Sequence, residues 1–176
     1  MTNPILKILI IEDSQAELLL FERYCKQLNF QVQGVETYSH ACQWMQQQSY
    51  DVILTDLCLT PNTAIQLHHQ GNTPVLEGLK LLRLAREEQP TALLVATSSL
   101  PNPLWYREAL RAGAHHFIPK PVGSAAELSL AFEVAAQARA KWNNMGGTTS
   151  IDAPVKPHLF PHGLIISDEH LKLCGR

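Results

Sequence analysis

Side chains that could bind a metal ion and a phosphoryl group stand at the ends of four apolar runs in this 176-residue sequence. They are Glu12, Asp13, Asp56, Thr97 and Lys120. Three carboxylates brought together repel one another and need a counter-charge, which a hard divalent cation such as Mg²⁺ supplies. A lysine ammonium and a threonine hydroxyl suit a phosphoryl group, since one supplies charge and the other a hydrogen bond. The carboxylate of Asp56, at the centre of such a set, could act as the nucleophile.

The apolar runs that carry these residues predict a parallel sheet. Short runs rich in Ile, Val and Leu predict strands at 8–11, 31–35, 52–55, 92–96 and 117–118. Between and after them, amphipathic spacing predicts helices at 14–28, 39–48, 78–88, 103–112 and 124–142. Such alternation is typical of a doubly wound α/β domain with a five-stranded parallel sheet. Ligands bind such sheets at the carboxyl ends of the strands, where all five side chains would then meet.

Two helix starts share one local pattern. Ser14-x-x-Glu17 and Ser124-x-x-Glu127 both read as capping boxes, in which the glutamate side chain reaches back to a free backbone N–H. We therefore expect the side chains of Glu17 and Glu127 to accept hydrogen bonds from backbone N–H groups at the starts of these two helices.

Composition excludes several classes of protein. Lys+Arg number 14 and Asp+Glu 16, a balance that predicts no nucleic-acid partner. No apolar run approaches the ~18 residues of a membrane span, and the N-terminus lacks the features of a signal peptide. The four cysteines form no CxxC pair and read as reduced thiols. We expect a cytoplasmic protein with about one domain.

The chemical residues, in this order, resemble the receiver domain of two-component response regulators. The resemblance rests on Glu12-Asp13, on Asp56 at the end of DVILTD, on Thr97 in VATS and on Lys120-Pro121 in FIPKP. Gly113-Ala114 before the last strand also looks like that family. It covers about residues 6–142 and implies a flavodoxin-like sheet with strand order 2-1-3-4-5.

What the resemblance implies is phosphorelay signalling. Asp56 would accept a phosphoryl group from a phosphohistidine on a sensor histidine kinase or a histidine phosphotransfer protein. Glu12, Asp13 and Asp56 would hold Mg²⁺, with the main-chain carbonyl of Cys58 as a further ligand. The domain would be a signalling phosphoacceptor that catalyses only its own phosphotransfer and slow autodephosphorylation.

The resemblance also implies a conformational switch read by a downstream protein. Lys120 would pair with the phosphoryl oxygens, and the Lys120–Pro121 peptide bond would be cis. Thr97 would move toward the phosphoryl group, and Phe117 would rotate inward behind it.

Three features depart from the family pattern. Gly78, which matches a glycine normally about eight residues after the phosphoacceptor, comes much later, so a long insertion is expected at about 58–77. The segment 143–176 is too short for a DNA-binding output domain, yet is apolar enough to dock on its own domain or, as we favour, to form a homodimer. Cys58 and Ser99 stand two residues beyond Asp56 and Thr97, and neither is a carboxylate or amide that could orient an attacking water, which predicts slow dephosphorylation.

Three other functions stay open. An unphosphorylated receiver-like adaptor would keep the fold without the chemistry. An aspartyl-phosphate phosphohydrolase of the haloacid dehalogenase type would need a second aspartate where Cys58 stands. A flavin-binding module would need a hydroxyl- and glycine-rich loop in place of Glu12-Asp13, which would repel phosphate.

Overall fold

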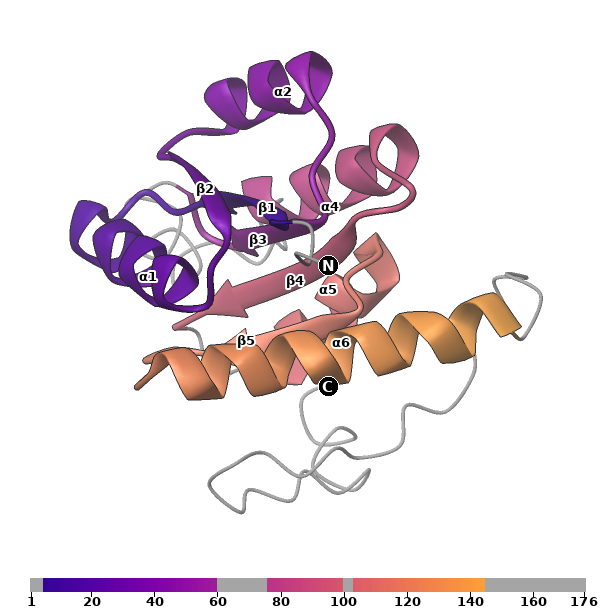
Figure 1. Cartoon of the computed structure of the whole chain (residues 1–176). Helices are drawn as coiled ribbons and strands as arrows, with labels where there is room; N and C mark the ends of the chain where they lie inside the picture. The colour runs from indigo at the N-terminus through magenta and orange to yellow at the C-terminus, as the bar shows by residue number, and fades with distance from the viewer. Residues whose placement is uncertain (1–4, 60–75, 100–102, 145–176) are drawn as a thin grey trace.

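The computed structural model describes residues 5–59, 76–99 and 103–144, which form a sheet flanked by helices (Figure 1). In chain order the elements are β1 (Lys7–Ile11), α1 (Gln15–Gln27), β2 (Gln31–Val35), α2 (Tyr38–Gln47), β3 (Val52–Asp56), α4 (Glu77–Glu88), β4 (Leu93–Ser98), α5 (Pro103–Ala112), β5 (His116–Pro119) and α6 (Ala125–Asn144). Every predicted strand and helix is present, with bounds that differ by one or two residues. The difference that bears on the site is in β4, which continues to Ser98 and so contains Thr97.

The five strands form one parallel sheet in the order β2-β1-β3-β4-β5. Figure 1 shows this order across the sheet, with α6 running along β4 and β5. The predicted fold class, a doubly wound flavodoxin-like α/β domain with strand order 2-1-3-4-5, is confirmed.

Alternate residues of the central strands pack into two separate cores, because successive side chains of a strand point to opposite faces. Ile8 and Ile10 of β1 join the core under α1 and α6. Leu9 and Ile11 join the core under α2, α4 and α5. All four are fully buried, and each contributes about 1.5–3 kcal/mol to the free energy of unfolding. This explains why the strand reads as an unbroken apolar run.

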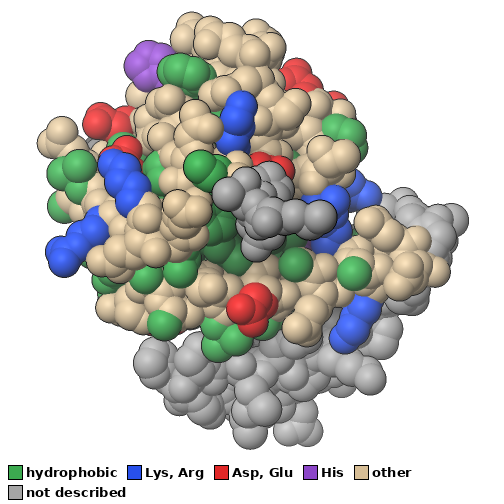
Figure 2. All heavy atoms as spheres, viewed as in Figure 1, with side chains coloured by type: hydrophobic (Ala, Val, Ile, Leu, Met, Phe, Trp, Pro, Cys, Tyr) green, Lys and Arg blue, Asp and Glu red, His purple; other side chains and the backbone are tan. Residues whose placement is uncertain are grey.

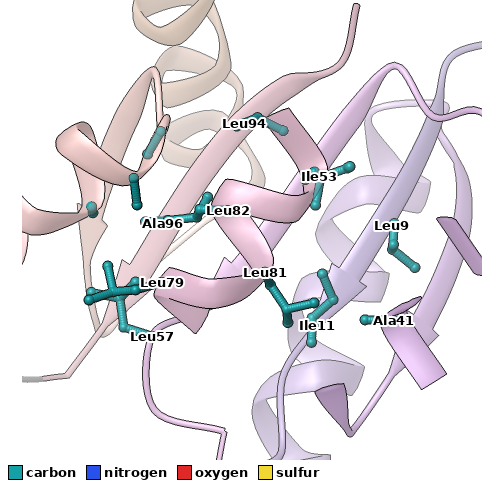
Figure 3. Packing of buried hydrophobic residues seen from close by; sticks show 14 of the residues in the cluster. Leu9, Ile11, Ala41, Ile53, Leu57, Leu79, Leu81, Leu82, Leu94 and Ala96 are labelled. Carbon is teal, nitrogen blue, oxygen red and sulfur yellow. The ribbon is translucent and has the colours of Figure 1, made fainter. Parts of the chain in front are cut away.

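Helix α4 packs against the centre of the sheet through leucines spaced along one face. Figure 3 shows Leu81 pointing toward Ile11 of β1 and Leu82 toward Ala96 of β4. Leu79 lies beside Leu57, which directly follows β3. The helix is thereby held against the end of the strand that carries Asp56.

The surface has mixed charge. On the face seen in Figure 2, Lys and Arg side chains are interspersed with Asp and Glu rather than gathered into one basic patch. Within the described ranges, no helix has both the length and the apolar character that a membrane crossing requires.

Most of the insertion expected at 58–77 and nearly all of the extension 143–176 lie outside the described residues. Docking of the extension, or a homodimer formed by it, therefore stays a prediction. The boundaries 6–142 also stay a prediction, although α6 continues to Asn144.

Candidate functional site

The sheet brings the predicted site residues to its carboxyl edge. Glu12 directly follows β1, Asp56 is the last residue of β3, and Lys120 directly follows β5. Thr97 is the register partner of Asp56 on the neighbouring strand β4. Because parallel strands end on the same side, residues more than 100 positions apart in the sequence share one site.

Three carboxylates form an acidic cluster at this edge. Glu12, Asp13 and Asp56 each present an oxygen, and these atoms lie within 4.8 Å of one another. Burial raises the pKa of Asp56 to about 6, and the charge of Asp13 adds to this, while Lys120 and backbone hydrogen bonds lower it. Burial likewise raises the pKa of Glu12 and of Asp13 above their ordinary values. Such crowded, poorly solvated oxygens are the ligand set that a hard divalent cation stabilises.

Two polar atoms at the edge are buried without a hydrogen-bond partner among the described residues. They are Oδ1 of Asp56 and Oγ1 of Thr97, in residues that are 5% and 1% exposed. Buried polar atoms normally have a partner, and leaving one without costs free energy. The pair therefore fits a group that binds between these two strands.

Lys120 is the buried cation of the site. Its Nζ lies 2.6 Å from Oε2 of Glu12 and 2.5 Å from Oε2 of Glu17, but 3.6 Å from Oδ1 of Asp56. Burial alone would lower the pKa of Lys120, but Asp56 and the two glutamates outweigh it and raise that pKa above its ordinary value. The lysine is therefore held charged, at hydrogen-bond distance from the glutamates and just beyond it from Asp56.

Glu17 is the site residue that the sequence pattern assigned to a different task. Its backbone N–H does reach Oγ of Ser14, at 3.5 Å, as a capping box requires. Its carboxylate, however, binds Lys120, and the Ser14 N–H donates to Oε1 of Glu12 instead. The predicted capping box is therefore only half formed. A signal was available: Glu17 is the acidic residue in the first turn of the helix that follows Glu12 and Asp13.

Phe117, which is expected to rotate when the domain is phosphorylated, lies on the strand next to the one that carries Thr97. Phe117, on β5, is 5% exposed, so its ring is buried. It packs edge-on against Tyr106 of α5, with ring centroids 5.8 Å apart. Phe117 is the register partner of Ala96, which precedes Thr97.

Two further expected features lie beside the acidic cluster. The Lys120–Pro121 peptide bond is cis. Cys58 is half-buried two residues after Asp56, and burial together with the charge of Asp56 raises the pKa of its thiol to about 11. The Cys58 thiol is therefore uncharged at neutral pH. The group of Cys58 that could contribute to a site for a hard cation is its main-chain carbonyl oxygen.

Asp56→Asn is expected to stabilise the metal-free fold at pH 7.5. The pKa of Asp56 in the folded protein, about 6, lies above the ordinary value of 3.8, so the folded state holds this proton more tightly than the unfolded chain. That contribution to stability is fully present below the ordinary pKa and is lost as the pH rises through 6. At pH 7.5 the carboxylate therefore costs on the order of 1–3 kcal/mol relative to an amide.

Urea unfolding in the presence of a chelator measures this difference. The gain should shrink as the pH is lowered from 7.5 to 5. Asp51→Asn is a matched control, because Asp51 is exposed and precedes the same strand, and it should show no such gain. An Asp56→Asn variant less stable than the wild type at pH 7.5 would contradict the expectation.

Several solved structures share the fold of this chain. A CheY-like receiver domain protein from Methanospirillum hungatei has a TM-score of 0.61 at 20% identity, over 78% of this chain and 99% of that chain. A response regulator from Thermotoga maritima has a TM-score of 0.60 at 17% identity, over 76% and 99%. A response regulator from Burkholderia pseudomallei, with a phosphorylated aspartic acid, a calcium ion and citrate, has a TM-score of 0.58 at 18% identity, over 81% and 75%.

At these identities the structures show a shared fold, and the family is shown by the sequence itself. No curated protein matches the sequence. The family model of the response regulator receiver domain, in contrast, matches residues 8–133, which is well over half of the chain. The matched range contains the acidic cluster, Thr97 and Lys120, and the chain therefore belongs to the response regulator receiver domain family.

Proposed function

We propose that this domain is a phosphorelay response regulator that accepts a phosphoryl group on Asp56 from a phosphohistidine of a partner protein. The observation that carries the proposal is the buried Asp56 carboxylate, within 4.8 Å of two further carboxylates and 3.6 Å from the Lys120 ammonium. Oδ1 of Asp56 and Oγ1 of Thr97, which have no hydrogen-bond partner among the described residues, support the same function. The donor would be a sensor histidine kinase or a histidine phosphotransfer protein.

The acidic cluster suits Mg²⁺, which Glu12, Asp13, Asp56 and the main-chain carbonyl of Cys58 would hold. When bound, the ion would neutralise the negative charge that gathers on the phosphoryl oxygens. Calcium accompanies the phosphorylated aspartate in the Burkholderia protein. We favour Mg²⁺ here because an open site with few carboxylates leaves room for the waters that this ion retains.

The chain's own residues account for the transfer step. A carboxylate oxygen of Asp56 attacks the phosphorus atom, and the bond from phosphorus to the histidine nitrogen breaks, with its electron pair going to that nitrogen. A proton, carried by the other ring nitrogen or supplied by water, makes the leaving group a neutral imidazole, and the other product is an acyl phosphate on Asp56. Burial leaves the attacking oxygen poorly solvated, and its pKa near 6 keeps it largely ionised at neutral pH. Lys120 supplies positive charge to the transferred oxygens, and the Thr97 hydroxyl donates a hydrogen bond to one of them.

The signal would pass from the site to a downstream protein through α5. Movement of Thr97 toward the phosphoryl group opens space beside Phe117, whose ring packs against Tyr106 on that helix. Dephosphorylation within the domain would be slow, because neither Cys58 nor Ser99 is a carboxylate or amide that could orient a water for attack. We place the domain in the cytoplasm, and the homodimer through 143–176 remains part of the proposal.

The proposed function is tested by intact mass after incubation with Mg²⁺ and a small acyl phosphate donor. The wild type should gain one phosphoryl group, and Asp56→Asn should gain none. Asp51→Asn, a change of the same size and charge at an exposed site, should behave like the wild type. A phosphoryl group on the Asp56→Asn variant would place the chemistry elsewhere. A wild type that gains nothing would favour the unphosphorylated adaptor.

A further inference from the structure

Two helices of this chain begin with the same pattern, and their glutamates are used differently. At the start of α6, Oε2 of Glu127 accepts a hydrogen bond of 2.9 Å from the Gly123 backbone N–H, close to the arrangement that the pattern predicts. At the start of α1, Oε2 of Glu17 lies 2.5 Å from Nζ of Lys120. The carboxylate of Glu17 is thus withdrawn from the backbone and committed to the cation of the site.

Lys120 has three acidic neighbours but lies at hydrogen-bond distance from only two of them. An ammonium has three N–H donors, and hydrogen bonds to Glu12 and Glu17 occupy two of them. Oδ1 of Asp56 lies 3.6 Å away, too far for a hydrogen bond, and it has no other donor among the described residues. The Lys120 ammonium therefore lies close to the two glutamates and farther from Oδ1 of Asp56, the residue that would carry the phosphoryl group.

The two glutamates differ in how easily they can release the lysine. The Glu12 side chain is 1% exposed, so its carboxylate could not exchange Lys120 for water. The Glu17 side chain is 40% exposed, so solvent can replace the ion pair at little cost. Of the two contacts, the one to Glu17 is the contact that can open.

We propose that Glu17 is a positioning residue that restrains Lys120 in the unphosphorylated domain, so that phosphorylation of Asp56 must draw the lysine away from it. The inference rests on the proposed function and deepens it. A phosphoryl group adds acceptor oxygens and a charge of about −1.5 to −2 beside Asp56. Lys120 moves toward this charge, and the carboxylate of Glu17 is released to solvent. Glu17 therefore lowers the affinity of the site for a phosphoryl group.

Glu17→Gln tests this, because it keeps the shape of the side chain and removes the competing charge. The probe is beryllofluoride, a phosphoryl analogue, titrated by calorimetry into the domain at saturating Mg²⁺. We expect the variant to bind the probe about two- to fivefold more tightly than the wild type, which is the range for an ion pair with one exposed partner. Without the probe, the variant should unfold at a slightly lower temperature, since it has lost that pair.

Tighter probe binding together with a lower unfolding temperature would identify Glu17 as a positioning residue. If Glu17 only supported the fold, its substitution would lower both the probe affinity and the unfolding temperature. Glu22→Gln is the matched control, because Glu22 lies on the same helix, has the same charge and pairs at 3.2 Å with the exposed Lys26. It should leave beryllofluoride affinity unchanged.

Equal or weaker binding by Glu17→Gln would overturn the inference while leaving the proposed function in place. A matching gain in Glu22→Gln would also overturn it, because the effect would then be one of net charge. Failure of the wild type to bind the probe, or binding that survives Asp56→Asn, would overturn the proposed function and this inference together.

Discussion

Replacing Lys120 with methionine is expected to lower the free energy of unfolding by about 3–5 kcal/mol at pH 7.5, the range for removing one partner of a buried ion pair. Methionine keeps much of the volume of the lysine stem but carries no charge. Glu12, whose side chain is 1% exposed, would lose its bond of 2.6 Å to Nζ, and Asp56 would lose the positive charge that lies 3.6 Å from its Oδ1. The two buried carboxylates of the acidic cluster, Glu12 and Asp56, would then lack the charge of Lys120.

Urea unfolding of the metal-free protein measures this loss. The control is Lys26→Met, which removes an exposed lysine paired with Glu22 on α1; its effect should stay below ~1 kcal/mol. Adding Glu12→Gln to the Lys120→Met variant should recover part of the loss, since the two residues are in contact. Equal, small effects at both lysines would show that Lys120 does not compensate the cluster.

Gly78→Ala is expected to destabilise the domain by about 2–3 kcal/mol, the upper part of the range for overpacking. A Cβ at this position would lie 2.1 Å from the main-chain oxygen of Asp56 and 2.5 Å from Cα of Leu57. Both are backbone atoms and cannot turn aside as a side chain could. The start of α4 would have to move, and the bond of 3.2 Å from the Gly78 N–H to the Leu57 carbonyl would break. The gain of ~1 kcal/mol from placing Ala in a helix does not offset this.

Gly123→Ala is the control, because it makes the same substitution at a glycine that no described backbone atom of another element approaches closely. A Cβ there would meet only the far end of the Glu127 side chain, at 3.3 Å. Gly123→Ala should therefore change the free energy of unfolding by less than ~0.5 kcal/mol. Denaturant unfolding of both variants makes the comparison. If Gly78→Ala were as stable as the wild type, α4 would not be held against the end of β3 as tightly as the structure indicates.

The sequence alone determined the elements and the acidic half of the site. A strand buried on both faces must be apolar at every position, so runs such as Ile8–Ile11 are recognisable without any knowledge of their neighbours. Asp56 and Glu12 were also predictable as a pair, because parallel strands place their carboxyl ends at one edge. The order of the strands was not predictable from local patterns and rested on the resemblance to the receiver family.

Only the tertiary structure decided how charge is shared within the site. The pattern Ser14-x-x-Glu17 records what the first turn of a helix needs, and it carries no information about Lys120, which lies 103 residues further along the chain. In the folded domain, Glu12 accepts the hydrogen bond from the Ser14 N–H. The Glu17 carboxylate binds the Lys120 ammonium instead, because a hydrogen bond from a charged donor is stronger than one from a backbone N–H. Local sequence thus specifies which groups are present at the edge. Their pairing depends on distances that exist only after the strands have assembled, because a carboxylate binds the strongest donor within its reach.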